Sequence, residues 1–181
     1  MSELMFRKAA SEDSRSIAEL IAESVRFLAR GIYDERQIEL SIRTVFGVDH
    51  QLIADGTYFV VESNTGQIAG CGGWSKRKTL YGASAYDQSR DPELLDPNID
   101  AAKIRAFFVH PDFARQGIGS AILEKCESEA KRAGFASAEM MATLPGVPLY
   151  SARGYSGNEL VQIPVGEDVE IDCIRMRKSL L

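Results

Sequence analysis

The chain has 181 residues and a formal net charge of −5, with 45% hydrophobic and 26% charged residues. This length allows one domain with a sizeable core and is too short for two ordinary ones, and the composition is that of a globular protein. The negative charge argues against a nucleic-acid partner and against an anionic membrane surface. The sequence contains no run of 18 apolar residues and no signal-peptide core, so we expect a cytoplasmic protein without membrane contact.

The three cysteines, Cys71, Cys126 and Cys173, are odd in number, and their spacing fits no metal site. Each lies in an apolar run, which predicts buried, reduced thiols. We therefore expect no metal cofactor.

Residues 4–8 predict a first strand, and two helices follow it. The first helix begins at Ser11, carries apolar residues at spacings of three and four, and ends at Gly31. The second begins at Asp34, because Gln37 stands three residues further on in capping-box spacing.

Residues 58–62 and 67–75 predict a hairpin, since the turn between them is built from residues that tolerate positive φ. Its second arm contains three glycines within residues 70–73. Glycines weaken a strand and mark a bulge or a close backbone approach, and that approach could be to a ligand.

Residues 76–102 show little periodicity. A structureless segment of this length is uncommon in a compact domain, and it is either a functional lid or disordered. It opens with Lys76-Arg77-Lys78, which is either a solvated strand end or an electrostatic handle for an acidic ligand.

The central stretch begins with Ile104 to Val109, which predict a buried strand interrupted by Arg105 and ended by Pro111. Gly117-Ile118-Gly119 then opens an amphipathic helix. A strand, a glycine turn and a helix N-terminus together predict a phosphate site. The first N–H groups of a helix lack intrahelical partners, and they lie at the positive end of the helix dipole. The third glycine of a dinucleotide fold and the Gly-Lys-Ser/Thr of a P-loop are both absent.

Residues 136–143 predict the next strand, and residues 159–165 and 169–176 predict a closing hairpin. The predicted order is β-α-α-β-β-β-α-β-α-β-β. This alternation predicts an α+β fold (an α/β/α sandwich), with a mixed, mostly antiparallel sheet of about seven strands and helices on both faces.

Two motifs resemble those of the GCN5-related N-acetyltransferase (GNAT) superfamily. The stretch from Val109 to Gly119 is similar to motif A, in which a strand ending in Val-x-Pro precedes Gln/Arg-x-x-Gly-x-Gly/Ala. Ala114 stands where the family has Gln or Arg, and the basic residue has moved to Arg115.

The second motif runs from Thr143 to Tyr155 and is similar to Asn-x-x-Ala-x-x-Phe/Leu-Tyr-x-x-x-Gly-Phe/Tyr. Tyr150 falls in register. Thr143 replaces the usual Asn, and Gly146 replaces the usual Ala.

The resemblance covers residues 3–178 and implies a single N-acetyltransferase domain with a GNAT-like fold. It implies acetyl-CoA as acyl donor and an unidentified amine as acceptor, and a homodimer is compatible with it. The implied cofactor-binding residues are Phe108, Val109, Arg115, Gln116, Gly117, Gly119, Ser120 and Thr143.

By the same resemblance, a backbone amide near Phe108 or Val109 stabilises the oxyanion, and Tyr150 is the catalytic acid that protonates the departing thiolate. The alternative for Tyr150 is an aromatic ring that only packs against the coenzyme. No single general base is identifiable: Glu139, His110, Asp87 and Asp100 are candidates, and a water relay is the alternative.

Substrate contacts are implied for Tyr33, Trp74 and Glu139. Tyr33, together with Arg36 and Gln37, lies at the junction of the first two helices, where the family has one wall of the acceptor site. The alternatives are a solvated helix start for these residues and a core anchor for Trp74.

Two functions from different classes remain open. The first is a working N-acyltransferase, and the second is a noncatalytic acyl-CoA-binding sensor module. A nucleotide-binding regulatory domain is disfavoured by the missing third glycine.

Overall fold

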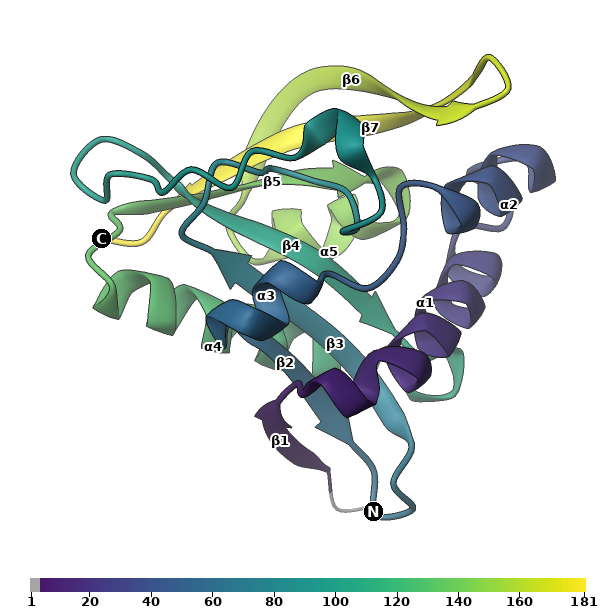
Figure 1. Cartoon of the computed structure of the whole chain (residues 1–181), viewed down its shortest axis with the longest axis horizontal. Helices are drawn as coiled ribbons and strands as arrows, with labels where there is room; N and C mark the ends of the chain where they lie inside the picture. Colours follow the sequence, from purple (N-terminus) through teal and green to yellow (C-terminus); the bar gives the residue numbers. More distant parts are fainter. Residues whose placement is uncertain (1–3) are drawn as a thin grey trace.

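The computed structural model describes residues 4–181, apart from the side chain of Gln88. A seven-stranded sheet runs through the molecule in the order β1-β2-β3-β4-β5-β7-β6 (Figure 1). Every neighbouring pair is antiparallel except β4 and β5, which are parallel. The predicted mixed, mostly antiparallel sheet is therefore confirmed.

The strands are β1 (Met5–Lys8), β2 (Tyr58–Glu62), β3 (Ile68–Ser75), β4 (Ala102–Val109), β5 (Ser137–Thr143), β6 (Ser156–Gly166) and β7 (Val169–Ser179). The helices are α1 (Ser14–Leu28), α2 (Glu35–Arg43), α3 (His50–Asp55), α4 (Ile118–Arg132) and α5 (Val147–Ala152). The predicted central strand is β4, and it lies in the middle of the sheet.

The helices α1, α2 and α3 cover one face of the sheet, and α4 and α5 cover the other (Figure 1). Alternation along β2 divides the core accordingly. Tyr58 and Val60 belong to the core beneath α1, α2 and α3, whereas Phe59 and Val61 belong to the core beneath α4. A strand buried on both faces is apolar throughout, which is why its sequence shows no alternation.

The first helix begins later than predicted. Residues Ser11–Asp13 form a 3₁₀ turn, and the helix proper begins at Ser14. The Asp13 carboxylate, rather than the Ser11 hydroxyl, accepts the hydrogen bond from the backbone N–H of Ala10 (2.7 Å).

The predicted capping box of α2 is confirmed. The Gln37 backbone N–H donates to Asp34 Oδ1 (2.8 Å), and the Asp34 N–H donates to Gln37 Oε1 (2.9 Å). The helix α3 was not expected from the sequence, because six residues are too few to show a helical period. Asp49 caps it by accepting from Leu52 N (3.1 Å), and Gly56, with φ of 69°, ends it.

The three glycines of β3 make close approaches to protein and not to a ligand. A Cβ on Gly70 would lie 2.7 Å from Ile118 of α4, and a Cβ on Gly72 would lie 2.8 Å from Ile122. A Cβ on Gly73 would lie 2.8 Å from a backbone oxygen. Gly70 and Gly72 let α4 lie close against the sheet, and Gly73 lets the backbone at Thr57 approach β3, which corrects the suggestion that these glycines approach a ligand.

The segment 76–101 is packed against the molecule. It runs back along itself, as Leu95 N donates to the Lys76 carbonyl (2.8 Å), and it is tied to the chain after α2 by Ala83 N donating to the Val45 carbonyl (2.9 Å). At its start Arg77 pairs with Asp55 (2.7 Å). The segment is thus packed on the molecule and is not structureless. Because Arg77 pairs with Asp55, its charge is neutralised within the protein and is not directed at an acidic ligand.

Candidate functional site

The strands β4 and β5 separate after a short parallel pairing. This pairing joins Ala102 to Ala138 and Lys103 to Glu139, and beyond these residues the described part of β4 pairs with β3 alone. Two cavities lie where the strands separate, since both are lined by the later residues of β4 and by Thr143 of β5.

The backbone amide of Val109 points toward this separation. The N–H of His110 donates to the Ala69 carbonyl of β3 (2.9 Å). Because successive residues of a strand direct their N–H groups to opposite sides, the N–H of Val109 points away from β3. It is therefore placed to meet a ligand instead of a neighbouring strand.

The larger cavity, called here the large groove, has a volume of about 680 Å³. Its walls come from α1, the end of β4, the glycine turn before α4, and the chain from β5 into α5. The lining residues are Ser24, Val25, Leu28, Ala29, Tyr33, Phe46, Phe107, Phe108, Val109, Ala114, Arg115, Gly117, Ile118, Gly119, Ser120, Thr143, Pro145, Gly146, Pro148, Leu149 and Tyr150.

The glycine turn leaves the N-terminus of α4 uncapped. In the part of the chain that the structure describes, no side chain caps it, and the first amide that bonds within this turn is Ala121 N, which donates to the Gly117 carbonyl (2.9 Å). Gly117 has φ of 81°, and a Cβ added there would meet no atom within 4 Å. The N–H groups of Ile118, Gly119 and Ser120 thus remain available, and the residues present fit a bound pyrophosphate.

Gln116 contributes to the turn differently from its neighbours. Its side chain donates to the Asp112 carbonyl (3.2 Å), and it is not among the residues that line the large groove. Arg115, with φ of 62°, does line the groove, so the shifted basic residue shares this groove with the glycine turn.

A second cavity, called here the small chamber, has a volume of about 90 Å³. It adjoins the large groove, because Phe46, Phe107, Phe108, Thr143 and Tyr150 line both. Its remaining walls are formed by Val45, Gly47, residues 80–83, residues 104–106, Met140, Met141, Ile163 and Cys173.

Tyr150 lies at the boundary of the two cavities, and its side chain is largely buried. Its ring packs edge-on against Phe107 (6.3 Å between centroids) and against Tyr155 (6.2 Å). Burial raises the pKa of Tyr150 above its usual value, and the nearby Cys126 adds to this effect. The phenol is therefore protonated at neutral pH and can donate a hydrogen bond or a proton.

Tyr33 lines the large groove and also holds its wall together. Its hydroxyl donates to the Asp172 carbonyl (2.6 Å) and accepts from Leu144 N (3.0 Å). Arg36 and Gln37 are turned to the β6–β7 hairpin, where Arg36 pairs with Glu167 (3.1 Å). Of the three residues, only Tyr33 lines a cavity.

Trp74 and Glu139 line neither cavity. The Trp74 ring packs edge-on against Phe135 (6.1 Å) in the core beneath α4. Glu139 is buried and pairs with Lys103 and with Arg175 (2.9 Å). Burial favours a higher pKa for Glu139, but the hydrogen bonds and charges of these two partners lower its pKa below the usual range.

The other candidate bases also lie outside both cavities. His110 caps the turn after β4, as its Nδ1 accepts from Asp112 N (3.2 Å), and its Nε2 lies 2.7 Å from a carboxylate oxygen of Glu23. Asp100 accepts from a backbone N–H within its own turn (2.7 Å), and Asp87 lies in a short 3₁₀ turn.

Sequence patterns did not single out several lining residues. The C-terminal half of α1 and residues 80–83 line the cavities because the fold brings them there, and no local pattern in the sequence marks them. Arg105 carried a signal, because it is a charged residue in an otherwise apolar central strand. No helix in the described part of the chain is long and apolar enough to cross a membrane.

Among solved structures, the chain is similar to a GCN5-related N-acetyltransferase from Rhodopseudomonas palustris, at 19% identity and a TM-score of 0.72, covering 99% of this chain and 97% of the other. It is similar to PaiA N-acetyltransferase from Thermoplasma acidophilum in complex with coenzyme A (16% identity, TM-score 0.65, 98% and 99% covered). The ribosomal-protein-S18-alanine N-acetyltransferase of Escherichia coli is also similar (16% identity, TM-score 0.60, 98% and 94% covered). These likenesses show the fold.

No curated protein matches the chain in sequence. The family model described as an acetyltransferase (GNAT) domain matches residues 54–156, which is more than half of the chain. The matched region contains β4, the glycine turn and Tyr150, and thus most of both cavities. The chain belongs to the GNAT acetyltransferase family.

Proposed function

We propose that the protein is an acetyl-CoA-dependent N-acetyltransferase that modifies a primary amine of a small molecule or peptide. The observation that carries the proposal is that the large groove is lined both by the uncapped glycine turn and by Tyr150, while the small chamber meets the same tyrosine. We further propose that residues 3–178 form one catalytic domain. Glu3 lies outside the described residues.

The coenzyme is held by backbone groups more than by charge. The N–H groups from Gln116 to Ser120 bind the pyrophosphate, and Arg115 adds one positive charge. The later residues of β4, Phe108 and Val109, line the arm that carries the thioester, and Thr143 faces it from β5. Fixing the thioester in this way removes translational freedom before the reaction begins.

In the transfer itself, the amine nitrogen bonds to the carbonyl carbon as the carbon–sulfur bond breaks. The Val109 N–H donates to the carbonyl oxygen as negative charge develops there, and a preorganised donor of this kind contributes roughly 3–4 kcal/mol. Tyr150 gives its proton to the departing sulfur and regains one from water. The amine's proton leaves through water, since no candidate base lines either cavity.

Turnover is the decisive test. The protein is mixed with acetyl-CoA and a panel of amines, amino acids and peptides, and release of free thiol is followed together with the mass of the acetylated product. We expect turnover with at least one class of amine. Tight coenzyme binding by calorimetry without turnover of any acceptor would instead identify a noncatalytic acyl-CoA-binding module.

A further inference from the structure

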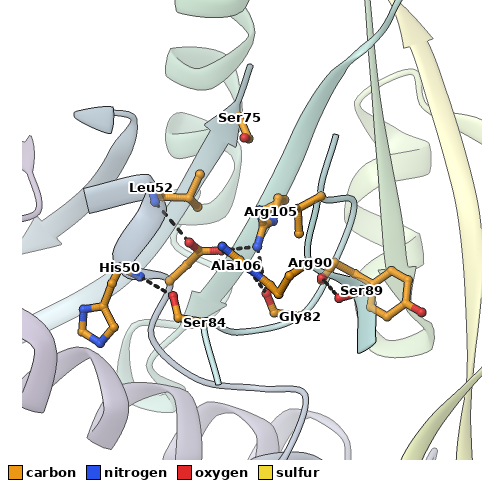
Figure 2. Close-up of polar contacts among 12 residues, drawn as sticks. His50, Leu52, Ser75, Gly82, Ser84, Ser89, Arg90, Arg105 and Ala106 are labelled. Carbon is orange, nitrogen blue, oxygen red and sulfur yellow. Dashed lines mark hydrogen bonds and ion pairs between the residues drawn. The ribbon is translucent and has the colours of Figure 1, made fainter. Parts of the chain in front are cut away.

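A buried arginine lines the small chamber. Arg105 extends from β4 toward the segment around Gly82, beside Arg90 (Figure 2). Its side chain is only 2% exposed. Within the described part of the chain it is the single charged residue that lines the chamber, whose other walls are apolar or aromatic side chains, glycine and one threonine.

The charge of Arg105 is not fully balanced by its surroundings. Asp49, whose side chain is 1% exposed, accepts from Arg105 Nη2 and also lies 3.3 Å from Arg90 Nη1. The other oxygen of Asp49 accepts from Leu52 N at the start of α3. Two guanidinium groups thus share one carboxylate, which leaves the cluster with one net positive charge beside the chamber.

The hydrogen bonds of Arg105 are also incomplete. Nη2 donates to Asp49 and to the Gly82 carbonyl (2.8 Å), whereas Nε and Nη1 are buried and have no partner in the described structure. Burial lowers the pKa of Arg105 to about 10, with Asp49 opposing and Arg90 assisting this shift, so the group is still charged at neutral pH. If Arg105 only held the Asp49 carboxylate and the Gly82 carbonyl in place, Nη2 alone would be enough. The unpartnered donors Nε and Nη1 destabilise the fold, and a purely structural role does not account for them.

We propose that the acceptor amine carries a carboxylate, which Arg105 binds in the small chamber while the amine faces the thioester beside Tyr150. This inference rests on the proposed acetyltransferase function and names the class of its substrate. Arg105 here is a specificity-determining residue: it selects the acceptor and takes no part in the bond changes.

The charge and size of the chamber favour a small monoanion. One net positive charge matches one carboxylate, whereas a phosphate monoester brings about −1.5 to −2 at neutral pH. A dry cavity of about 150 Å³ suffices for benzene in another protein. A chamber of about 90 Å³ is smaller than that cavity, and it has room for a carboxylate and a few methylene groups.

The test uses matched acid and amide pairs: glycine with glycinamide, β-alanine with β-alaninamide, and 4-aminobutanoate with 4-aminobutanamide. Each is titrated calorimetrically into the intact protein saturated with coenzyme A, so that the readout is independent of turnover. We expect at least one acid to bind about 10- to 100-fold more tightly than its amide, which is the worth of a hydrogen bond to a charged group.

Two variants separate binding of a carboxylate by Arg105 from the structural contact of Arg105 with Asp49. Arg105→Gln should reduce the acid-to-amide ratio of affinities to about one. The comparison variant Arg90→Gln removes the second guanidinium from the same carboxylate and with it the net positive charge, but it keeps the Arg105 donors that line the chamber, so the ratio should fall only in part. If Arg105→Gln does not fold, the wild-type ratios and competition by butanoate, which has no amine, still decide the question.

Equal affinity of acids and amides for the wild-type protein, or no binding of any acid in the series, overturns the inference. If acetyl-CoA nevertheless supports turnover of other amines, the proposed acetyltransferase function stands without it. If acids bind selectively but no amine is ever acetylated, the carboxylate site stands and the proposed function fails.

Discussion

The missing side chain of Gly146 provides the space that the ring of Tyr150 occupies. A Cβ built on Gly146 would lie 2.7 Å from Tyr150 Cε2, which is closer than real Cβ atoms approach. Gly146 has φ of −83°, a conformation that any residue adopts, so alanine is excluded there by the ring and not by the backbone. The glycine and the tyrosine thus form a matched pair at the boundary of the two cavities.

Gly146→Ala should therefore displace the Tyr150 ring and lower turnover. We expect kcat to fall by about 10²-fold, because a displacement of about 1 Å at a reacting group has effects of this size. Steady-state kinetics gives the measurement. The double variant Gly146→Ala/Tyr150→Phe should be little worse than Tyr150→Phe alone, since both changes remove the same interaction. Additive losses would show that Gly146 acts elsewhere.

Tyr150→Phe separates proton donation from packing. If the phenol donates to the departing sulfur, kcat should fall by about 10²–10⁴-fold while coenzyme affinity changes little. Rapid kinetics and calorimetry measure the two quantities. Tyr155→Phe is the matched control, because its ring packs against Tyr150 but lines neither cavity, and it should keep its turnover. A fully active Tyr150→Phe variant would assign Tyr150 to packing alone.

Gly119→Val should weaken coenzyme binding. Any side chain at this position enters the crowded end of the large groove, where a Cβ would already lie 3.0 Å from Leu149 Cδ2. We expect at least about a tenfold loss of affinity, because charge-assisted hydrogen bonds to the pyrophosphate are displaced. Calorimetric titration of coenzyme A measures it. Gly134→Ala, at the far end of α4 with φ of 97°, should reduce thermal stability and leave affinity unchanged.

Glu139→Gln should affect stability and not the acceptor. The folded state lowers the pKa of Glu139, so its charged form stabilises the fold above the unfolded pKa of about 4.5, and this stabilisation is lost as the pH falls through the folded value. The variant should lose about 3 kcal/mol of unfolding free energy near pH 7, and the difference from wild type should shrink below pH 4.5.

Denaturant titrations of wild-type and variant protein across this pH range measure the effect of Glu139→Gln. The exposed residue Glu124 of α4 provides the control, since Glu124→Gln should change stability little at any pH. A raised KM for the acceptor with unchanged stability would show that Glu139 contacts the substrate and that its assignment to a structural ion cluster is wrong.

Local sequence signals were sufficient wherever a residue's role depends on its neighbours in the chain. The capping box of Asp34 and Gln37, the hairpin of β2 and β3, and the strand β4 all follow from spacing and propensity, and all are confirmed. The helix α3 escaped because it is too short to show a period.

Contacts distant in the chain could not be predicted. Arg105 and Asp49 are 56 positions apart, so the sequence shows a charge in an apolar strand but not its partner. The glycines of β3 suggested a ligand, and only the fold reveals that α4 approaches Gly70 and Gly72 and that the Thr57 carbonyl approaches Gly73. Trp74 and Glu139 lie in the core and in a buried ion cluster, because the pleat of their strands and not their chemistry decides which way they face.

The brief contact between β4 and β5 has a consequence for amide hydrogen exchange. Among residues 4–181, the pairs Ala102–Ala138 and Lys103–Glu139 are the only ladder between two half-sheets, β1 to β4 on one side and β5, β7 and β6 on the other. Because residues of both halves line the large groove, a coenzyme bound there, as proposed, would bridge them where no strand does. Its binding should therefore slow exchange across each half-sheet, including amides in β1 and β6 that no ligand reaches.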